Sequence, residues 1–186
     1  MSMNAVIIQT AMENCVIYNS ENLPRAVTSF DPLEYAVSAA KNKGLYVYCI
    51  YNLLTMPGES EALEHASPVT ASVLDTMADE LSGFIKKYKP DGILLADYYN
   101  PETETSYADY LTGGGGIGYQ NYMESISRIA VETAAGIIHT KAPGVQVGLL
   151  TTAVWANEAD NAAGSKTNAD FAAWTDGNAD VLAFVE

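Results

Sequence analysis

The sequence predicts an α/β fold built from repeated parallel βα units. Four apolar, strand-like runs are each followed by a helix-like stretch, and a fifth apolar run closes the chain. The runs are Ala5–Gln9, Leu45–Tyr51, Gly92–Ala96, Val145–Leu150 and Val181–Val185. Parallel strands need a crossover connection that is long enough to hold a helix, so this alternation indicates a parallel sheet. In such folds the functional groups lie at the carboxyl ends of the strands.

Capping residues, prolines and glycines mark where the helices begin and end. Asp31-Pro32-Leu33-Glu34 combines a capping aspartate, a proline suited to the first helical position and a glutamate that can complete a capping box, and Gly44 ends this helix. Further helices are expected from Ser67-Pro68 to about Tyr88, over roughly Gln120–Thr140 and, as a short one, after Asn168. The polar stretch Thr151–Thr167 is expected to be a loop. The sequence therefore predicts five strands and about four helices in a single domain, residues 1–186.

The composition excludes several classes of function. The formal net charge is −14, with 9 basic against 23 acidic residues, and such a surface repels nucleic acid. No apolar run approaches the ~20 residues of a membrane-spanning helix, so no membrane insertion is expected. Two cysteines, expected to be buried thiols, and two histidines offer no metal-ligand spacing. The sequence thus predicts neither a metal site nor a cofactor.

Two glycine-based nucleotide motifs are also disfavoured. The run Gly113–Gly116 is not followed by Lys and Ser or Thr and does not directly succeed a strand, so a mobile surface loop is the better interpretation. An open-sheet nucleotide binder would carry Gly-x-Gly-x-x-Gly after the first strand, where Gln9-Thr-Ala-Met12 stands.

Several stretches are similar to stretches of one family, and they occur in the same order along nearly the whole chain. They are Asn4–Gln9, Tyr18–Ser20, Asp31–Ala36, Gly44–Asn52, Tyr88–Ile93, Asp97–Pro101, Lys141–Gly148 and Trp155. They resemble the glycoside-hydrolase-like 10 family of bacterial glycosidases, which are eight-stranded βα barrels. The resemblance implies that this chain covers an internal portion of a TIM-type barrel, with one strand preceding Met1 and two following Glu186. An incomplete barrel exposes strand edges, so self-association is expected.

The same resemblance implies a set of site residues and some losses. The matching candidates are Gln9, Tyr18, Asn52, Asp97, Tyr98 and Trp155. Ala96 stands where the family has the first of two aspartates, and Tyr48 where it has a histidine. Ala11 and Cys15 replace an arginine and an aspartate. These departures leave open the alternative that the barrel binds glycan without hydrolysing it.

The residues themselves suggest how hydrolysis would be arranged. Glycoside hydrolysis needs two carboxyl groups that flank the scissile bond. Asp97 follows the third apolar run and Glu186 follows the fifth, so these are the candidate catalytic pair, ahead of the loop acids Glu13, Glu102, Glu104 and Asp109. Tyr98, Tyr99 and Trp155 are expected to offer rings on which sugar faces can stack, whereas Tyr46 and Tyr48 are expected in the core.

The sequence therefore predicts a glycoside-hydrolase-like domain that acts on or binds a bacterial polysaccharide or cell-wall glycan. The alternative is an inactive carbohydrate-binding or vestigial barrel domain. No signal peptide is expected from the first residues, and the residues assign no location, although the resemblance suggests the cell envelope or secretion.

Overall fold

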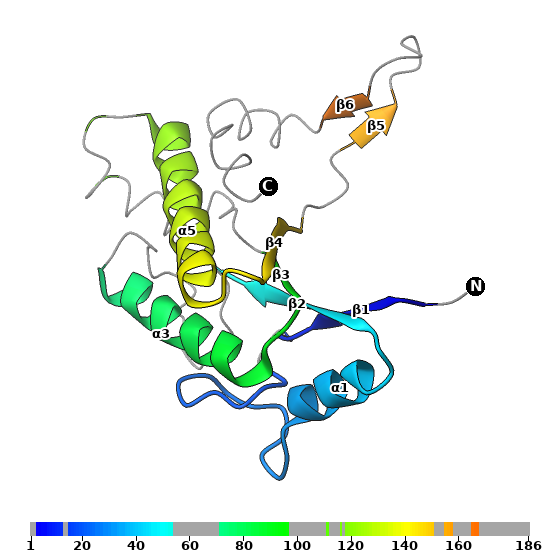
Figure 1. Ribbon diagram of the computed structural model, residues 1–186. Helices are drawn as coiled ribbons and strands as arrows, with labels where there is room; N and C mark the ends of the chain where they lie inside the picture. The colour runs from blue at the N-terminus through cyan, green and yellow to red at the C-terminus, as the bar shows by residue number, and fades with distance from the viewer. Residues whose placement is uncertain are drawn as a thin grey trace.

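The centre of the fold is a parallel sheet of four strands. The computed structural model describes residues 3–12, 15–53, 71–96, 111, 116, 118–150, 155–157 and 165–167. The strands are β1 (Ala5–Gln9), β2 (Tyr46–Asn52), β3 (Gly92–Ala96) and β4 (Gln146–Leu149), in the order β1-β2-β3-β4 (Figure 1). Four of the five predicted strands are thereby confirmed to within one residue at each end, and the fifth, Val181–Val185, lies outside the described residues.

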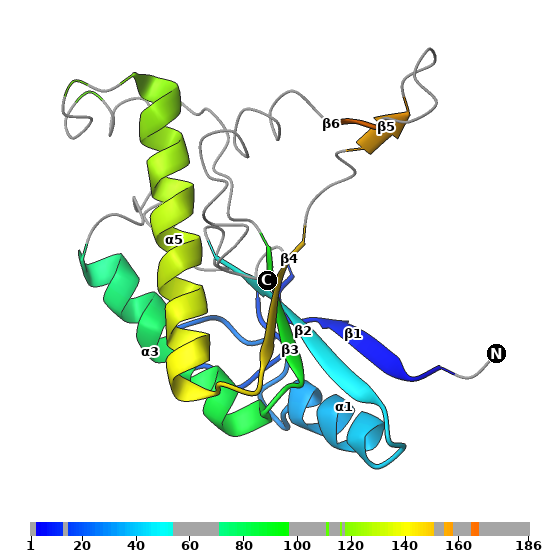
Figure 2. The same cartoon turned by 45° about the horizontal axis from the view of Figure 1, so that its top comes forward.

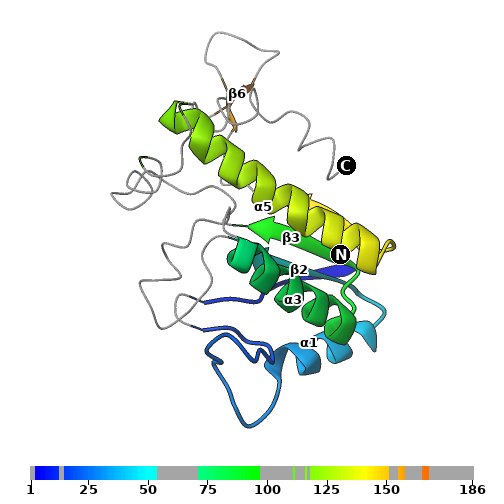
Figure 3. The same cartoon turned by 90° about the vertical axis from the view of Figure 1, so that its left-hand side faces the viewer.

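The order of the strands distinguishes a barrel from a doubly wound sheet. Every neighbouring pair is parallel and consecutive in sequence, whereas a doubly wound sheet reverses its order at a switch point. The crossovers contain α1 (Pro32–Lys41), α3 (Ala71–Tyr88) and α5 (Tyr119–Lys141). The three helices pack side by side and share one core with the sheet (Figures 2 and 3). The predicted α/β fold of barrel type is confirmed, in an incomplete form, because the four described strands do not close on themselves.

One face of the sheet carries the core beneath these helices. Val47, Cys49 and Tyr51 of β2 alternate along the strand, and Cys49 and Tyr51 lie opposite Ile93 and Leu95 of β3. All five are buried. The helices cover them with Leu33, Val37, Met77, Leu81, Phe84, Ile85, Tyr88, Ala130, Val131, Ala134 and Ile138. Burial of this apolar surface is the main force that fixes the helices on this face.

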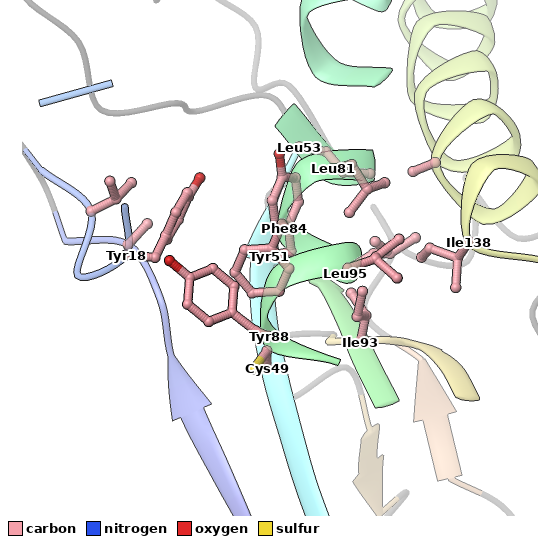
Figure 4. Close-up of a cluster of buried hydrophobic side chains, with 14 of the residues drawn as sticks. Tyr18, Cys49, Tyr51, Leu53, Leu81, Phe84, Tyr88, Ile93, Leu95 and Ile138 are labelled. Atoms are coloured by element: carbon pink, nitrogen blue, oxygen red, sulfur yellow. The ribbon is translucent and has the colours of Figure 1, made fainter. Parts of the chain in front are cut away.

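Four aromatic side chains meet inside this core, as Figure 4 shows. The ring of Phe84 packs edge-on against Tyr18, with centroids 5.1 Å apart, and against Tyr51 at 5.6 Å. Tyr88 completes the cluster at 5.0 Å from Phe84. Such edge-to-face pairs add about 1 kcal/mol each beyond the area they bury. The cluster joins the segment after β1, the strand β2 and the helix α3.

Helix α1 begins as its sequence predicts and is tied to α3 at that point. Asp31 Oδ1 accepts the N–H of Glu34 at 3.1 Å, and Pro32 occupies the first turn. Asp31 Oδ2 accepts the Tyr88 hydroxyl and the Lys87 ammonium, each at 2.6 Å. Burial alone would raise the pKa of Asp31, but these donors outweigh it and hold that pKa below its ordinary value.

The segment between β1 and α1 fills the part of the helix layer that the short α1 leaves uncovered. Val16, Tyr18 and Leu23 are buried against the core although they belong to no helix. Glu80 of α3, which is 9% exposed, accepts the Ser20 hydroxyl at 3.0 Å. The same carboxylate oxygen accepts the Asn22 side-chain amide at 2.7 Å. A buried carboxylate is tolerated when donors satisfy it, so Glu80 anchors this segment.

The opposite face of the sheet has no described helix over it. Tyr46, which was expected in the core, lies on this face and is 60% exposed, so that expectation is wrong. Ile7 of β1 lies on the same face and is 62% exposed. In a closed barrel this face would point to the interior, where further strands bury it. The incomplete sheet explains why these apolar side chains are accessible.

The last part of the chain differs from its prediction. Two short strands, β5 (Trp155–Asn157) and β6 (Ser165–Thr167), form an antiparallel pair within the stretch 151–167 that was expected to be a loop. The pattern was too weak to predict them because each strand has three residues and little apolar alternation. Three further predictions lie outside the described residues. They are the start of the second helix at Ser67-Pro68, the short helix after Asn168, and the glycine run Gly113–Gly116 except for Gly116 itself.

Candidate functional site

The carboxyl ends of the strands meet along one edge of the sheet. Asn52, the last residue of β2, lies opposite Ala96, the last residue of β3. The N–H of Leu53 donates to the carbonyl of Ala96 at 2.9 Å, and that of Leu150 donates to Leu95 at 2.9 Å. These bonds continue the ladder just past the strands. The edge is where a parallel βα fold places its functional side chains.

Asn52 presents an unused hydrogen-bond acceptor at this edge. Its side chain is half-buried and lies on the face away from the helices, two residues beyond Ile50. Its Oδ1 is buried and, among the described contacts, has no hydrogen-bond partner. The neighbouring side chain across the ladder is the methyl group of Ala96, which offers no donor. An unpaired buried acceptor costs about 1–3 kcal/mol unless a water, an ion or a ligand supplies the donor.

Gln9 is the last residue of β1 at the same edge, and Thr10 follows it. Gln9 lies opposite Ile50, so its exposed side chain shares the open face with Asn52. Its Nε2 donates to the carbonyl of Ala11 at 3.1 Å, and this local hydrogen bond sets the orientation of the side-chain amide. The buried Thr10 hydroxyl donates to the carbonyl of Ile50 at 2.5 Å and thereby fixes the end of β1 against β2. The structure brings Gln9 and Asn52 to one face and one edge, and their contact with a ligand stays a prediction.

Tyr18 is not brought together with these two residues. Its ring is 4% exposed and belongs to the aromatic cluster on the helix side of the sheet (Figure 4). Burial, with the negative charge of Glu80 in addition, raises the pKa of Tyr18 above its ordinary value, so the phenol stays neutral. A contact between Tyr18 and a ligand stays a prediction from the resemblance. What the structure does show is a packing role.

The remaining candidates fall largely outside the described residues. Asp97, Tyr98, Tyr99 and Glu186 are among the residues that the structure does not describe, so the predicted catalytic pair is untested. Ala96, the residue before Asp97, lies beside Asn52 at the carboxyl edge. Trp155 begins β5 and lies opposite Thr167 of β6. Its role in binding sugar also stays a prediction.

Glu80 is an organising residue of this region that sequence reasoning did not select. It sits within the apolar stripe formed by Met77, Leu81 and Phe84, and a charged residue in such a stripe was the available signal. Its hydrogen bonds to Ser20 and Asn22 hold the segment that leaves the carboxyl end of β1. Glu80 therefore influences the shape of the carboxyl edge indirectly, through the segment that follows β1.

The described residues contain no group of three or more histidine, cysteine, aspartate or glutamate side chains placed to hold a metal ion. None of the described helices combines the length and the apolar composition that crossing a bilayer requires. Among the cysteines, Cys49 is buried, as expected, whereas Cys15 is only half-buried.

Comparison with known proteins supports the fold. No family model matches this chain, and no curated protein matches it. Among solved structures, the α-L-fucosidase isoenzyme 2 from Paenibacillus thiaminolyticus superposes with a TM-score of 0.60 at 15% sequence identity. The match covers 80% of this chain and 27% of that protein, so the chain spans about a quarter of its length. At this identity the similarity shows a shared α/β fold of TIM-barrel type.

Proposed function

We propose that this chain is a glycoside-hydrolase-like domain whose carboxyl edge acts on or binds a bacterial polysaccharide or cell-wall glycan. Asn52 and Gln9 contact the sugar at the described part of this edge, and Asp97 is the candidate catalytic carboxylate. Glu186 is the candidate second carboxylate. Tyr98, Tyr99 and Trp155 are the candidate stacking residues.

The observation that carries this proposal is the unpaired Oδ1 of Asn52. It lies at the carboxyl end of β2, where parallel βα folds bind their ligands. A buried carbonyl oxygen without a partner selects a ligand that brings a donor, and sugar hydroxyl groups are such donors. The fold neighbour is an α-L-fucosidase, which supports a glycoside as the ligand class.

The charge of the chain is consistent with an uncharged ligand. A net charge of −14 disfavours nucleic acid and other phosphate-rich ligands, which need cationic partners. Neutral oligosaccharides pay no such electrostatic penalty. They are bound by convergent hydrogen-bonding groups together with flat aromatic rings.

The experiment is a hydrolysis assay on a panel of bacterial cell-wall oligosaccharides and fucosides, read as the release of new reducing ends. We expect turnover by the native chain and a loss of roughly a hundredfold or more in Asp97→Asn, because one of the two carboxyl groups is removed. Asp79→Asn, at an exposed position of α3, is the matched control and should keep full activity. Turnover that survives Asp97→Asn would contradict the catalytic assignment.

A second candidate function is favoured by one observation at the edge. The side chain beside Asn52 on β3 is the methyl group of Ala96, so no carboxylate stands at that described position. A domain of this kind would bind glycan without cleaving it. The same panel distinguishes the two functions: a glycan that raises the melting temperature without any release of reducing ends supports binding alone.

A further inference from the structure

Three buried polar side chains lie together next to the carboxyl edge, on the helix side of the sheet. Tyr18, Tyr51 and Glu80 come from the segment after β1, from β2 and from α3. The rings of Tyr18 and Tyr51 both pack on Phe84 (Figure 4). Glu80 precedes Phe84 by four residues, so it lies on the same face of α3, one turn nearer the carboxyl ends of the strands.

The charge of Glu80 reaches both phenols. Burial raises the pKa of Tyr18 and of Tyr51, and the negative charge of Glu80 raises both pKa values further. Each phenol therefore keeps its proton and can donate a hydrogen bond. Glu80 Oε1 already accepts Ser20 and Asn22. Because a carboxylate offers about four acceptor positions, Glu80 has the capacity for another donor.

The Tyr51 hydroxyl is the donor that is left over in this group. It is buried and, among the described contacts, has no hydrogen-bond partner. An unpaired hydroxyl is costly in a protein interior, and buried waters typically make about three hydrogen bonds to such groups. The hydroxyls of Tyr51 and Tyr18 and the carboxylate of Glu80 supply three partners for one water molecule.

Tyr51 links this group to the candidate site. Tyr51 and Asn52 are consecutive on β2, and their side chains point to opposite faces of the sheet, Tyr51 to the helices and Asn52 to the open face. The same carboxylate of Glu80 holds the segment that follows Gln9, the last residue of β1. Glu80 is therefore connected to the ends of both strands that contribute side chains to the described part of the edge.

We propose that Glu80 and Tyr51 are positioning residues for the carboxyl edge and are joined by one buried water molecule. Their contact holds β2 against α3 at the residue before Asn52, and it thereby sets the place of the Asn52 side chain. This inference rests on the proposed function, in which Asn52 contacts the sugar. A side chain that binds through directional hydrogen bonds must be held to within about 0.5 Å by its supporting residues.

The first experiment needs no glycan and measures urea unfolding. Tyr51→Phe keeps the ring and removes only the hydroxyl, and we expect it to lower the equilibrium constant for folding by about fivefold. In a Glu80→Gln chain the same change should cost only about twofold, because hydrogen bonds to an ionised group are about twice as strong as neutral ones. Asp31→Asn, which alters another carboxylate that accepts a tyrosine hydroxyl, is the control background and should leave the fivefold cost unchanged.

Two results of this experiment would overturn the proposal. A Tyr51→Phe chain that is as stable as the native chain, or more stable, would show that the hydroxyl has no partner. An equal cost of Tyr51→Phe in the native and Glu80→Gln backgrounds would show that the two side chains are not joined.

The second experiment follows Asn52 itself by NMR. Glu80→Gln should shift the resonances of the Asn52 side-chain amide, because β2 is then held differently at the preceding residue. Asp31→Asn should leave these resonances unchanged, since Asp31 bonds to Lys87 and Tyr88 at the other end of α3. An Asn52 amide that does not respond to Glu80→Gln would contradict the positioning role.

The third experiment uses a glycan that the native chain binds. Glu80→Gln should weaken its affinity by about threefold or more, and the effect should disappear in an Asn52→Leu background, because the residue through which Glu80 acts is then absent. A weakening that persists in Asn52→Leu would overturn the inference. A native chain that binds no glycan would instead contradict the proposed function, and the unfolding and NMR results would still decide whether Glu80 positions Asn52.

Discussion

The ring of Tyr48 lies over the backbone of Gly92, its register partner on the next strand. A Cβ atom placed on Gly92 would come within 2.4 Å of Tyr48 Cδ1. The ring continues across β3, and its hydroxyl donates to Oε1 of Gln146 on β4 at 2.6 Å. One side chain thus spans three strands on the open face, and the glycine is what makes room for it. This contact fixes the amino-terminal half of the sheet, opposite the carboxyl edge where the site lies.

Gly92→Ala should destabilise the fold by about 2 kcal/mol, because the added methyl group forces the Tyr48 ring out of its place. The measurement is urea unfolding. Gly148→Ala is the matched control on β4, since its Cβ would meet only the flexible end of Leu94 at 3.0 Å, and it should cost less. Adding Gly92→Ala to a Tyr48→Ala chain should cost little. An equal cost in both backgrounds would show that the ring is not the cause.

Asp31 should make the free energy of unfolding depend on pH in the acidic range. Its pKa is lowered in the folded chain, because donors from Lys87 and Tyr88 outweigh the opposing effect of burial. Its stabilisation is therefore complete above the unfolded pKa of about 4 and is lost as the pH falls below it. Asp31→Asn should be less stable than the native chain by about 1 kcal/mol near neutral pH. The difference should shrink on acidification, and a difference that is constant with pH would contradict this role.

Glu80 should control the order of the segment that follows β1. Glu80→Ala leaves the donors of Ser20 and Asn22 without their carboxylate, and we expect a loss of about 2–3 kcal/mol. Glu80→Gln keeps one acceptor oxygen and should lose less. Hydrogen exchange should show faster amide exchange over residues 17–23 in Glu80→Ala. Unchanged exchange there would mean that the segment is held by its apolar contacts alone.

The two cysteines should react very differently with a thiol reagent. Cys49 is fully buried, and burial, opposed only weakly by the charge of Lys41, raises its pKa to about 12. Cys15 is half-buried and accessible. At about pH 8 we expect one of the two thiols to react in the native chain and the second to react only on unfolding. Equal rates for Cys15 and Cys49 in the native chain would contradict the burial of β2.

The regular elements were predictable because their signals are local. The apolar run at residues 92–96 coincides with β3, and the Asp31-Pro32 pair coincides with the start of α1. Tyr46 was placed wrongly because alternation along a strand shows that two faces exist, but not which of them the helices cover. Which face the helices cover depends on how the whole sheet closes, and this involves contacts between residues that are far apart in the sequence.

The site was predictable only in part for a similar reason. Gln9 and Asn52 share an edge because both end parallel strands, and strand ends can be located in sequence. Tyr18 lies in an irregular segment without a repeating pattern, so its burial against Phe84 could not be derived. The role of Glu80 depends on donors 58 and 60 residues away, which no local pattern reveals.

The most direct test of the central claim compares Asn52→Leu with the native chain in melting temperature and in affinity for a glycan from the panel. Removing the unpaired Oδ1 of Asn52 should raise the melting temperature by about 2–4 °C and weaken glycan binding by about tenfold or more. Ser127→Ala is the control: it removes another buried, unpaired oxygen, on α5, and should leave glycan affinity unchanged. Glycan affinity that is unchanged in Asn52→Leu, or a native chain that binds no glycan of the panel, would contradict the account.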